Sequence, residues 1–196
     1  MSRPRSGERR QEILEALVRM LEKSKGEHIT TASLAEAVGV SEAALYRHFP
    51  SKGKMFEDLI KFIEETIFTR INRILDEQKN SRERIQQMMV LVLGFAEKNP
   101  GITRLLQGDV LVGETKRLRD RISQFFDRLE TQFKQILREG ELAGEIRQPV
   151  PDAARLLLTT VEGRITQYVR TGFRESPIKG WQELWQMLDE VVFRSG

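Results

Sequence analysis

The chain has 196 residues, with 32 Lys and Arg against 29 Asp and Glu, so its formal net charge is only +3. It contains no Cys and two His, which excludes disulfide scaffolds and thiol nucleophiles and leaves too few ligands for an ordinary zinc site. No apolar run approaches the roughly 20 residues of a membrane span, and the Arg-rich start lacks the apolar stretch of an export signal. We therefore expect a cytoplasmic protein without a metal or cofactor.

The basic excess is concentrated at the N-terminal end. Up to Phe56 there are ten basic and seven acidic residues, whereas the rest of the chain carries 22 of each. Four arginines open the sequence, at Arg3, Arg5, Arg9 and Arg10. Such a run predicts an arm that reaches phosphates or a minor groove, and the alternative is a solvated segment without a partner.

Apolar residues recur at helical spacing along the chain, and no segment alternates as a half-buried strand does, so the pattern predicts an all-α protein. Three helices are expected first. One carries an apolar stripe from Ile13 to Leu21. A short second helix is opened by Thr30 or Thr31 and broken by Gly39, and Ser41 caps a short third helix.

Longer helices follow. The regular apolar period after Leu118 is expected to stop at Gly140 and Gly144, and Pro149 and Pro151 are expected to bound a loop. Further helices are predicted near 52–79, 85–96, 102–106, 118–137, 156–169 and 181–192.

The last two helices are unusually apolar for segments so close to the end of a chain, where few elements remain to cover them. This favours a two-fold interface in which paired terminal helices hide each other's aromatic faces. The alternative is that these side chains close the protomer's own core. The residues expected at the interface are Leu157, Val161, Ile165, Trp181, Trp185 and Leu188.

The segment 29–56 contains two short helices joined by a turn at Gly39, which is the helix-turn-helix pattern. Ala35 is small where the second helix crosses closely, and Val40 and Leu45 can pack both helices over the first helix of the chain. The run Tyr46-Arg47-His48-Phe49-Pro50-Ser51-Lys52 resembles the end of the recognition helix in TetR-type regulators. This resemblance implies about nine helices, with a DNA-binding domain over 1–54 and a helical dimerisation and partner-binding domain over 55–196.

Candidate DNA contacts divide by their reach. Hydroxyl, imidazole and ammonium groups at helix ends suit phosphates and are expected to set affinity; these are Thr31, Tyr46, His48 and Lys52. Side chains on the exposed start and face of the recognition helix suit base edges and are expected to set specificity; these are Ser41, Glu42, Ala43, Ala44 and Arg47. For Glu42 and Arg47 the alternative is a solvated surface pair.

The chain is similar, over roughly Arg9 to Glu139, to the nucleoid occlusion members of that family. This resemblance implies a homodimer on a pseudo-palindromic site that, when bound to DNA, captures the C-terminal tail of the division protein FtsZ in a groove between the fourth and fifth helices. From their positions on the helix faces, the residues expected in this groove are Phe62, Arg70, Leu91, Gly94, Lys98 and Asn99. Members of the family have Arg where this chain has Lys98, and the chain departs from them at 108–114 and from 143 onward.

Phe62 and Arg70 lie off the main apolar stripe of their helix, so the protomer's core does not explain them. For Phe62 and Leu91 ordinary helix packing is the alternative. A ligand-responsive TetR-type repressor remains the second functional hypothesis, and it requires an apolar pocket with convergent polar groups inside the C-terminal bundle. The apolar stripes carry few polar residues, which favours a closed core. No nucleophile elbow, phosphate loop or His–carboxylate pair indicates an enzyme.

Overall fold

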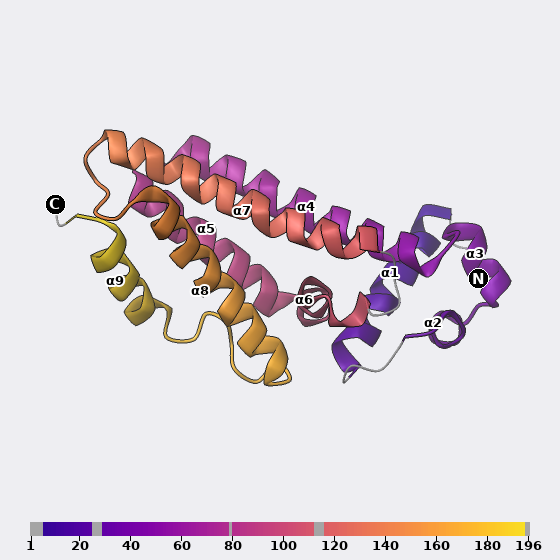
Figure 1. The fold of residues 1–196 in the computed structure, drawn as a ribbon. Coiled ribbons are helices and arrows are strands. Elements are labelled where there is room, and N and C mark those ends of the chain that lie inside the picture. The colour runs from indigo at the N-terminus through magenta and orange to yellow at the C-terminus, as the bar shows by residue number, and fades with distance from the viewer. Residues whose placement is uncertain (1–5, 25–28, 79, 112–115, 195–196) are drawn as a thin grey trace. The chain divides into compact units, whose positions relative to one another are not determined.

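The computed structural model describes residues 6–24, 29–78, 80–111 and 116–194, and across these ranges the chain is helical. One isolated antiparallel bridge joins Ile146 and Phe193, and these ranges contain no strand. The predicted all-α fold is confirmed (Figure 1). The helices of this described part are α1 (Ser6–Lys23), α2 (Thr31–Val38), α3 (Glu42–His48), α4 (Lys52–Glu77), α5 (Ser81–Lys98), α6 (Pro100–Gln107), the 3-10 turn η1 (Asp109–Leu111), α7 (Lys116–Leu142), α8 (Val150–Arg170) and α9 (Trp181–Val192).

The helices form two compact units that are each discontinuous in sequence. The first unit contains the chain up to Ile63 together with Asn99–Ile122, and the second contains Glu64–Lys98 and the chain from Ser123 onward. Both α4 and α7 contribute residues to each unit. A functional boundary between residues 54 and 55 stays a prediction, because these units reflect packing alone.

In the first unit α1 packs against α2, α3 and α6. The apolar stripe from Ile13 to Leu21 supplies buried side chains, as its spacing predicted. Helix α6 approaches α1 so closely that a Cβ atom at Gly101 would lie 2.1 Å from the carbonyl oxygen of Val18. Only glycine permits this contact, which fixes α6 against the helix that also supports α2 and α3.

In the second unit the aromatic rings of Phe68 on α4 and Phe125 on α7 meet edge to face, with centroids 5.6 Å apart. Arg84 on α5 donates to the carboxylate of Glu139 on α7 at 2.6 Å. The hydroxyl of Tyr168 on α8 donates to the backbone carbonyl of Glu97 on α5 at 3.1 Å. These contacts join α4, α5, α7 and α8, which share this unit with α9, around its apolar core.

Two boundaries differ from the sequence prediction. Gly140 does not interrupt α7 but lies within it, because α5 packs so closely that a Cβ there would be 2.7 Å from the Ser81 hydroxyl oxygen. The segment between Pro149 and Pro151 is the beginning of α8 rather than a loop. Proline fits the first turn of a helix because its missing N–H would have no partner inside the helix.

The six side chains expected at a subunit interface are buried within the protomer itself. Leu157, Val161 and Ile165 are fully buried, and Trp181 and Trp185 of α9 are only 9% and 7% exposed. The two indole rings stack on each other with centroids 6.0 Å apart. This burial supports the alternative that these side chains close the protomer's own core, and their place at a subunit interface stays a prediction.

The apolar surface that α8 and α9 do present consists of other residues. Leu156 on α8 and Met187 and Val191 on α9 are large apolar side chains that remain exposed, Met187 to 59%. Among the described residues, no helix combines the length and the hydropathy needed to cross a membrane.

Candidate nucleic-acid interface and partner surface

The helix-turn-helix is built by local capping signals. The Thr30 hydroxyl oxygen accepts from the backbone N–H of Ser33 at 3.1 Å and begins α2. Gly39 ends α2 in the left-handed conformation, with φ at 73°. The Ser41 hydroxyl oxygen then accepts from the N–H of Ala44 at 3.2 Å and begins α3. These caps turn the chain sharply and present α3 beside α2.

Helix α3 and its N-cap residue expose four of the five side chains that the sequence assigned to base recognition. Its buried side is formed by Leu45 and by Phe49, the residue that caps its C-terminal end. The nine candidate DNA contacts fall into two classes: Ser41, Glu42, Ala43, Tyr46 and Arg47 are exposed, whereas Thr31, Ala44, His48 and Lys52 are half-buried. Arg47 and Glu42 are therefore accessible for contacts with base edges, and polar side chains flank them on this surface.

Three of the candidates form one hydrogen-bonded chain. The Thr31 hydroxyl on α2 donates to the Glu42 carboxylate on α3 at 2.8 Å. The phenol of Tyr46 donates to the oxygen of that hydroxyl over a longer distance, 3.4 Å. The network joins two residues assigned to phosphates with one assigned to a base, so the Glu42 carboxylate already has a partner in the protein.

Lys52 begins α4 and contributes to the packing of the domain. Its ammonium group donates to the backbone carbonyl of Ile29 at 3.2 Å and lies 5.9 Å from the ring centroid of Phe56. The ammonium carries three donors, and the bond to Ile29 uses one of them.

Two of the four N-terminal arginines belong to α1 and not to an extended arm. Arg9 pairs with Glu12 one turn later at 2.8 Å, and Arg10 contacts His48, Phe49 and Asp58. Arg3 and Arg5 lie outside the described residues. Sequence reasoning missed the role of Arg10 because its partners are 38 or more positions away, and no local pattern reports such a contact.

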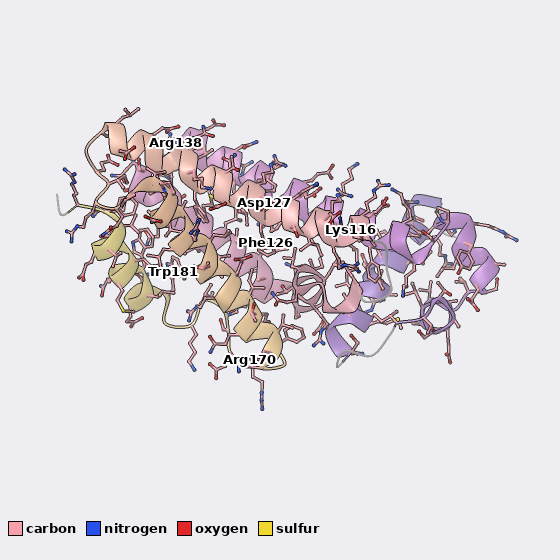
Figure 2. All side chains as sticks on the ribbon, viewed as in Figure 1. Lys116, Phe126, Asp127, Arg138, Arg170 and Trp181 are labelled. Atoms are coloured by element: carbon pink, nitrogen blue, oxygen red, sulfur yellow. The ribbon has the colours of Figure 1, made fainter. Side chains whose placement is uncertain are left out.

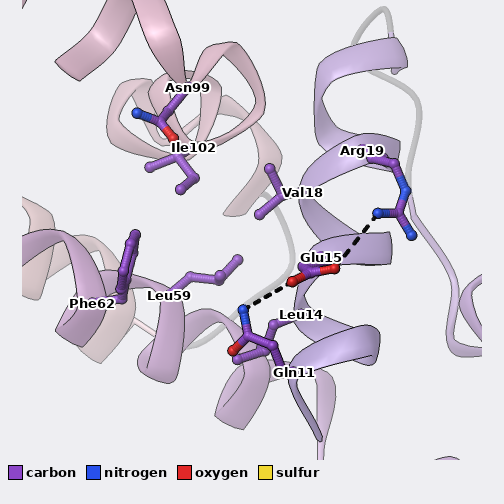
Figure 3. A pocket seen from close by; sticks show the side chains of 9 residues that line it. All are labelled: Gln11, Leu14, Glu15, Val18, Arg19, Leu59, Phe62, Asn99 and Ile102. Atoms are coloured by element: carbon purple, nitrogen blue, oxygen red, sulfur yellow. Dashed lines mark hydrogen bonds and ion pairs between the residues drawn. The ribbon is translucent and has the colours of Figure 1, made fainter. Parts of the chain in front are cut away.

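Phe62 of α4 is 50% exposed, an unusual degree of exposure for a large aromatic side chain. It lines an open pocket of about 370 Å³ in the first unit (Figure 3). Asn99, a second candidate of the partner groove, lines the same pocket, so the structure brings these two together. The full lining is Gln11, Leu14, Glu15, Val18 and Arg19 of α1, Leu59 and Phe62 of α4, and Asn99 and Ile102 at α6.

The four other groove candidates belong to the second unit. Arg70 on α4 and Lys98 on α5 are exposed, and Leu91 and Gly94 on α5 are half-buried. Leu91, Gly94 and Lys98 share one face of α5 at spacings of three and four residues. A Cβ atom at Gly94 would meet nothing within 4 Å, so the chain's own packing does not require glycine there.

A separate group of acids lies on α7 and α8. Burial raises the pKa of the Glu162 carboxyl on α8, and the neighbouring carboxylates of Glu130 and Asp127 raise it further. Within the described residues, no three His, Asp or Glu side chains are grouped as a metal site requires.

Comparison with known proteins places this geometry in a family. The profile of bacterial regulatory proteins of the tetR family matches residues 13–59, and the SlmA-like profile described as tetracyclin repressor-like, C-terminal domain, matches residues 79–192. The chain is 56% identical over 186 residues to the nucleoid occlusion factor SlmA of Marinomonas sp. (strain MWYL1), with 94% of each chain covered. The chain belongs to the SlmA family. It is thus a member of the TetR-type DNA-binding regulators and not of an enzyme family.

Other members of the SlmA family match as completely. The nucleoid occlusion factor SlmA of Vibrio vulnificus (strain YJ016) is 52% identical over 195 residues, which cover 98% of this chain and 100% of the relative. The similarity therefore includes the region after residue 143, where the sequence alone suggested a departure.

Solved structures agree on the fold. A transcriptional regulator from Saccharomonospora viridis in complex with choline aligns with a TM-score of 0.80 at 21% identity, covering 96% of this chain and 100% of that one. The ketosteroid transcriptional regulator KstR2 of Mycobacterium tuberculosis aligns with a TM-score of 0.76 at 22% identity, covering 95% and 96%. At such identities these structures show the TetR fold alone.

Proposed function

We propose that two copies of this chain bind a pseudo-palindromic site on chromosomal DNA and that the bound dimer captures the acidic C-terminal tail of FtsZ. Capture of the tail stops the division ring from assembling over the nucleoid. The observation that carries this proposal is the similarity to nucleoid occlusion factors over nearly the whole chain.

The DNA step rests on the exposed face of α3. Arg47 can pair with the O6 and N7 atoms of guanine, and Ala43 can contact a thymine methyl group. Thr31, Tyr46, His48 and Lys52 flank this face and would fix its register on the phosphates. A two-fold dimer presents two such helices to half-sites about 34–36 Å apart, which is one turn of duplex.

The dimer step rests on α8 and α9. Their exposed apolar residues, Leu156, Met187 and Val191, are those that a second copy would cover. Such side chains on two neighbouring helices of one unit form a self-complementary surface when a two-fold axis brings the same face of another copy against it.

The partner step rests on charge and on open space. Arg70 and Lys98 are exposed cations that suit an acidic tail. The face of α5 at Gly94 leaves room for a peptide backbone, and the pocket beside Phe62 is of a size to hold apolar side chains. Because Lys98 is a point charge rather than a planar fork, it would make a single contact with a carboxylate and not a paired one.

The test measures binding of a labelled FtsZ tail peptide to the full-length chain by fluorescence anisotropy. Binding is compared with and without a duplex that the wild-type chain has selected from a randomised library. We expect DNA to strengthen tail binding, and we expect Phe62→Ala and Arg70→Ala each to abolish it while affinity for the duplex is unchanged. The matched control is Arg138→Ala, which removes an exposed arginine from α7 (Figure 2).

Two results would contradict the proposal. The first is a wild-type chain that binds the selected duplex but ignores the tail at all concentrations. The second is release of the duplex by a small molecule without any tail binding, which would favour a ligand-responsive repressor.

A further inference from the structure

Arg10 of α1 makes three different contacts around the end of the recognition helix α3. Its Nη1 group donates to the backbone carbonyl oxygen of His48 at 2.7 Å. The centre of its guanidinium lies 4.1 Å from the centroid of the Phe49 ring. Its Nη2 group pairs with the carboxylate of Asp58 on α4. One side chain thus joins the last residue of α3, the capping residue after it, and the next helix.

These contacts matter because α3 has only seven residues, too few to be stable without tertiary support. The last carbonyl groups of a helix lack partners inside it, and a cation at this end also interacts favourably with the helix dipole. Arg10 satisfies the carbonyl of His48 and lies over Phe49, which is fully buried. Only a planar guanidinium can stack on a ring and donate two hydrogen bonds in its plane at the same time.

Asp58, the residue of α4 that pairs with Arg10, stays charged. Burial by itself raises the pKa of Asp58, but hydrogen bonds from Arg10 and Lys54 outweigh it and hold the pKa below its ordinary value. The ammonium of Lys54 lies 3.3 Å from the Asp58 carboxylate. At neutral pH the guanidinium of Arg10 is therefore held against a full negative charge.

From these contacts we propose that Arg10 is a positioning residue for base recognition. It fixes the angle of α3 on the domain from behind and does not itself contact DNA. The base-reading side chains Arg47 and Glu42 extend from the helix that it fixes, so a small rotation of α3 moves both of them relative to the base edges. This inference uses only DNA binding by the helix-turn-helix and is independent of the FtsZ tail.

The experiment separates a positioning role from a phosphate contact. Affinity is measured for the selected duplex and for a shuffled duplex of the same length, across a range of salt concentrations. Arg10→Met and Asp58→Asn each break the arrangement, and Arg10→Lys keeps the charge without the planar fork. Lys23→Met, which changes an exposed cation of the same helix, is the control.

Arg10→Met and Asp58→Asn are expected to weaken binding to the selected duplex about tenfold, similar to losing one base contact. Binding to the shuffled duplex and the salt slope should not change, because no phosphate contact is lost. Arg10→Lys should resemble Arg10→Met. Since Asp58→Asn keeps the shape of its side chain, it serves as the readout if Arg10→Met fails to fold.

The proposal is overturned if Arg10→Met reduces the salt slope by about one phosphate and weakens both duplexes equally, since Arg10 would then contact the DNA backbone. It is also overturned if the Arg10 and Asp58 variants all keep wild-type discrimination between the two duplexes.

Discussion

Substitution of Gly94 is expected to raise the stability of the chain and to weaken binding of the FtsZ tail, so it distinguishes an effect on folding from an effect on partner binding. It lies inside α5, where glycine costs about 1 kcal/mol relative to alanine. A Cβ at this position meets nothing within 4 Å, so alanine enters the helix without strain. We expect Gly94→Ala to stabilise the chain by about 0.5–1 kcal/mol. For a chain of this length that raises the Tm by about 1–4 °C.

Gly101 provides the opposite case in the same protein. Its Cβ would lie 2.1 Å from the Val18 carbonyl oxygen and 3.1 Å from the Glu22 nitrogen, and both are backbone atoms that cannot rotate away. Overpacking of this kind costs about 1–3 kcal/mol or more, so Gly101→Ala should lower the Tm. The two substitutions are chemically identical and should shift the Tm in opposite directions.

The assay is thermal unfolding followed by circular dichroism at one fixed protomer concentration, because a dimer's Tm depends on concentration. Tail binding is measured in parallel. Gly94→Ala should weaken it, since the added methyl group occupies the space offered to the peptide. Gly163→Ala, also in a helix interior with open space around its Cβ, should stabilise equally and leave tail binding unchanged.

A lower Tm for Gly94→Ala would mean that the glycine has a packing role within the chain. A higher Tm with unchanged affinity for the tail would remove this face of α5 from the partner site.

Three further predictions concern DNA binding, pH and assembly. Lys52→Ala should weaken binding to all duplexes and reduce the salt slope by about one phosphate, and an unchanged slope would leave Lys52 with a structural role only. Arg47→Ala should instead relax the preference at particular base pairs. Because the folded chain binds the Glu162 proton more tightly than the unfolded chain does, the carboxylate costs stability at neutral pH. Glu162→Gln should therefore stabilise there, and the gain in urea denaturation should fade as the pH falls towards 4.5, the ordinary pKa; an equal gain in acid would contradict this reasoning. Met187→Glu should shift the chain to monomers in sedimentation experiments, and a persistent dimer would exclude this part of α9 from the interface.

Much of the helix-turn-helix could be predicted from the sequence because its signals are local. Thr30 and Ser41 cap the N–H groups three residues later, and Gly39 adopts the left-handed conformation that other residues avoid. Each of these choices is made within a few residues, so a sequence pattern reports it directly.

The rest depends on contacts between distant segments. Gly140 was expected to break a helix, yet it lies inside one because Ser81 packs against it. The sequence cannot tell whether apolar side chains such as Trp181 and Trp185 are covered by a second copy or by their own protomer. Only the three-dimensional packing shows that they are buried within the protomer. The pocket beside Phe62 likewise joins α1 to residues of α4 and α6 that are far away in the sequence.

The hydrogen bond from Thr31 to Glu42 bears on how this protein can change during evolution. In the proposed division of DNA contacts Glu42 faces bases and Thr31 faces phosphates, so a substitution that removes the Glu42 carboxylate for a new operator would also remove the acceptor of the Thr31 hydroxyl. A lineage that changes its preferred DNA sequence would then also have to adjust its contacts with the phosphate backbone of the DNA. Paired substitutions at these two positions are consequently the expected record of operator drift.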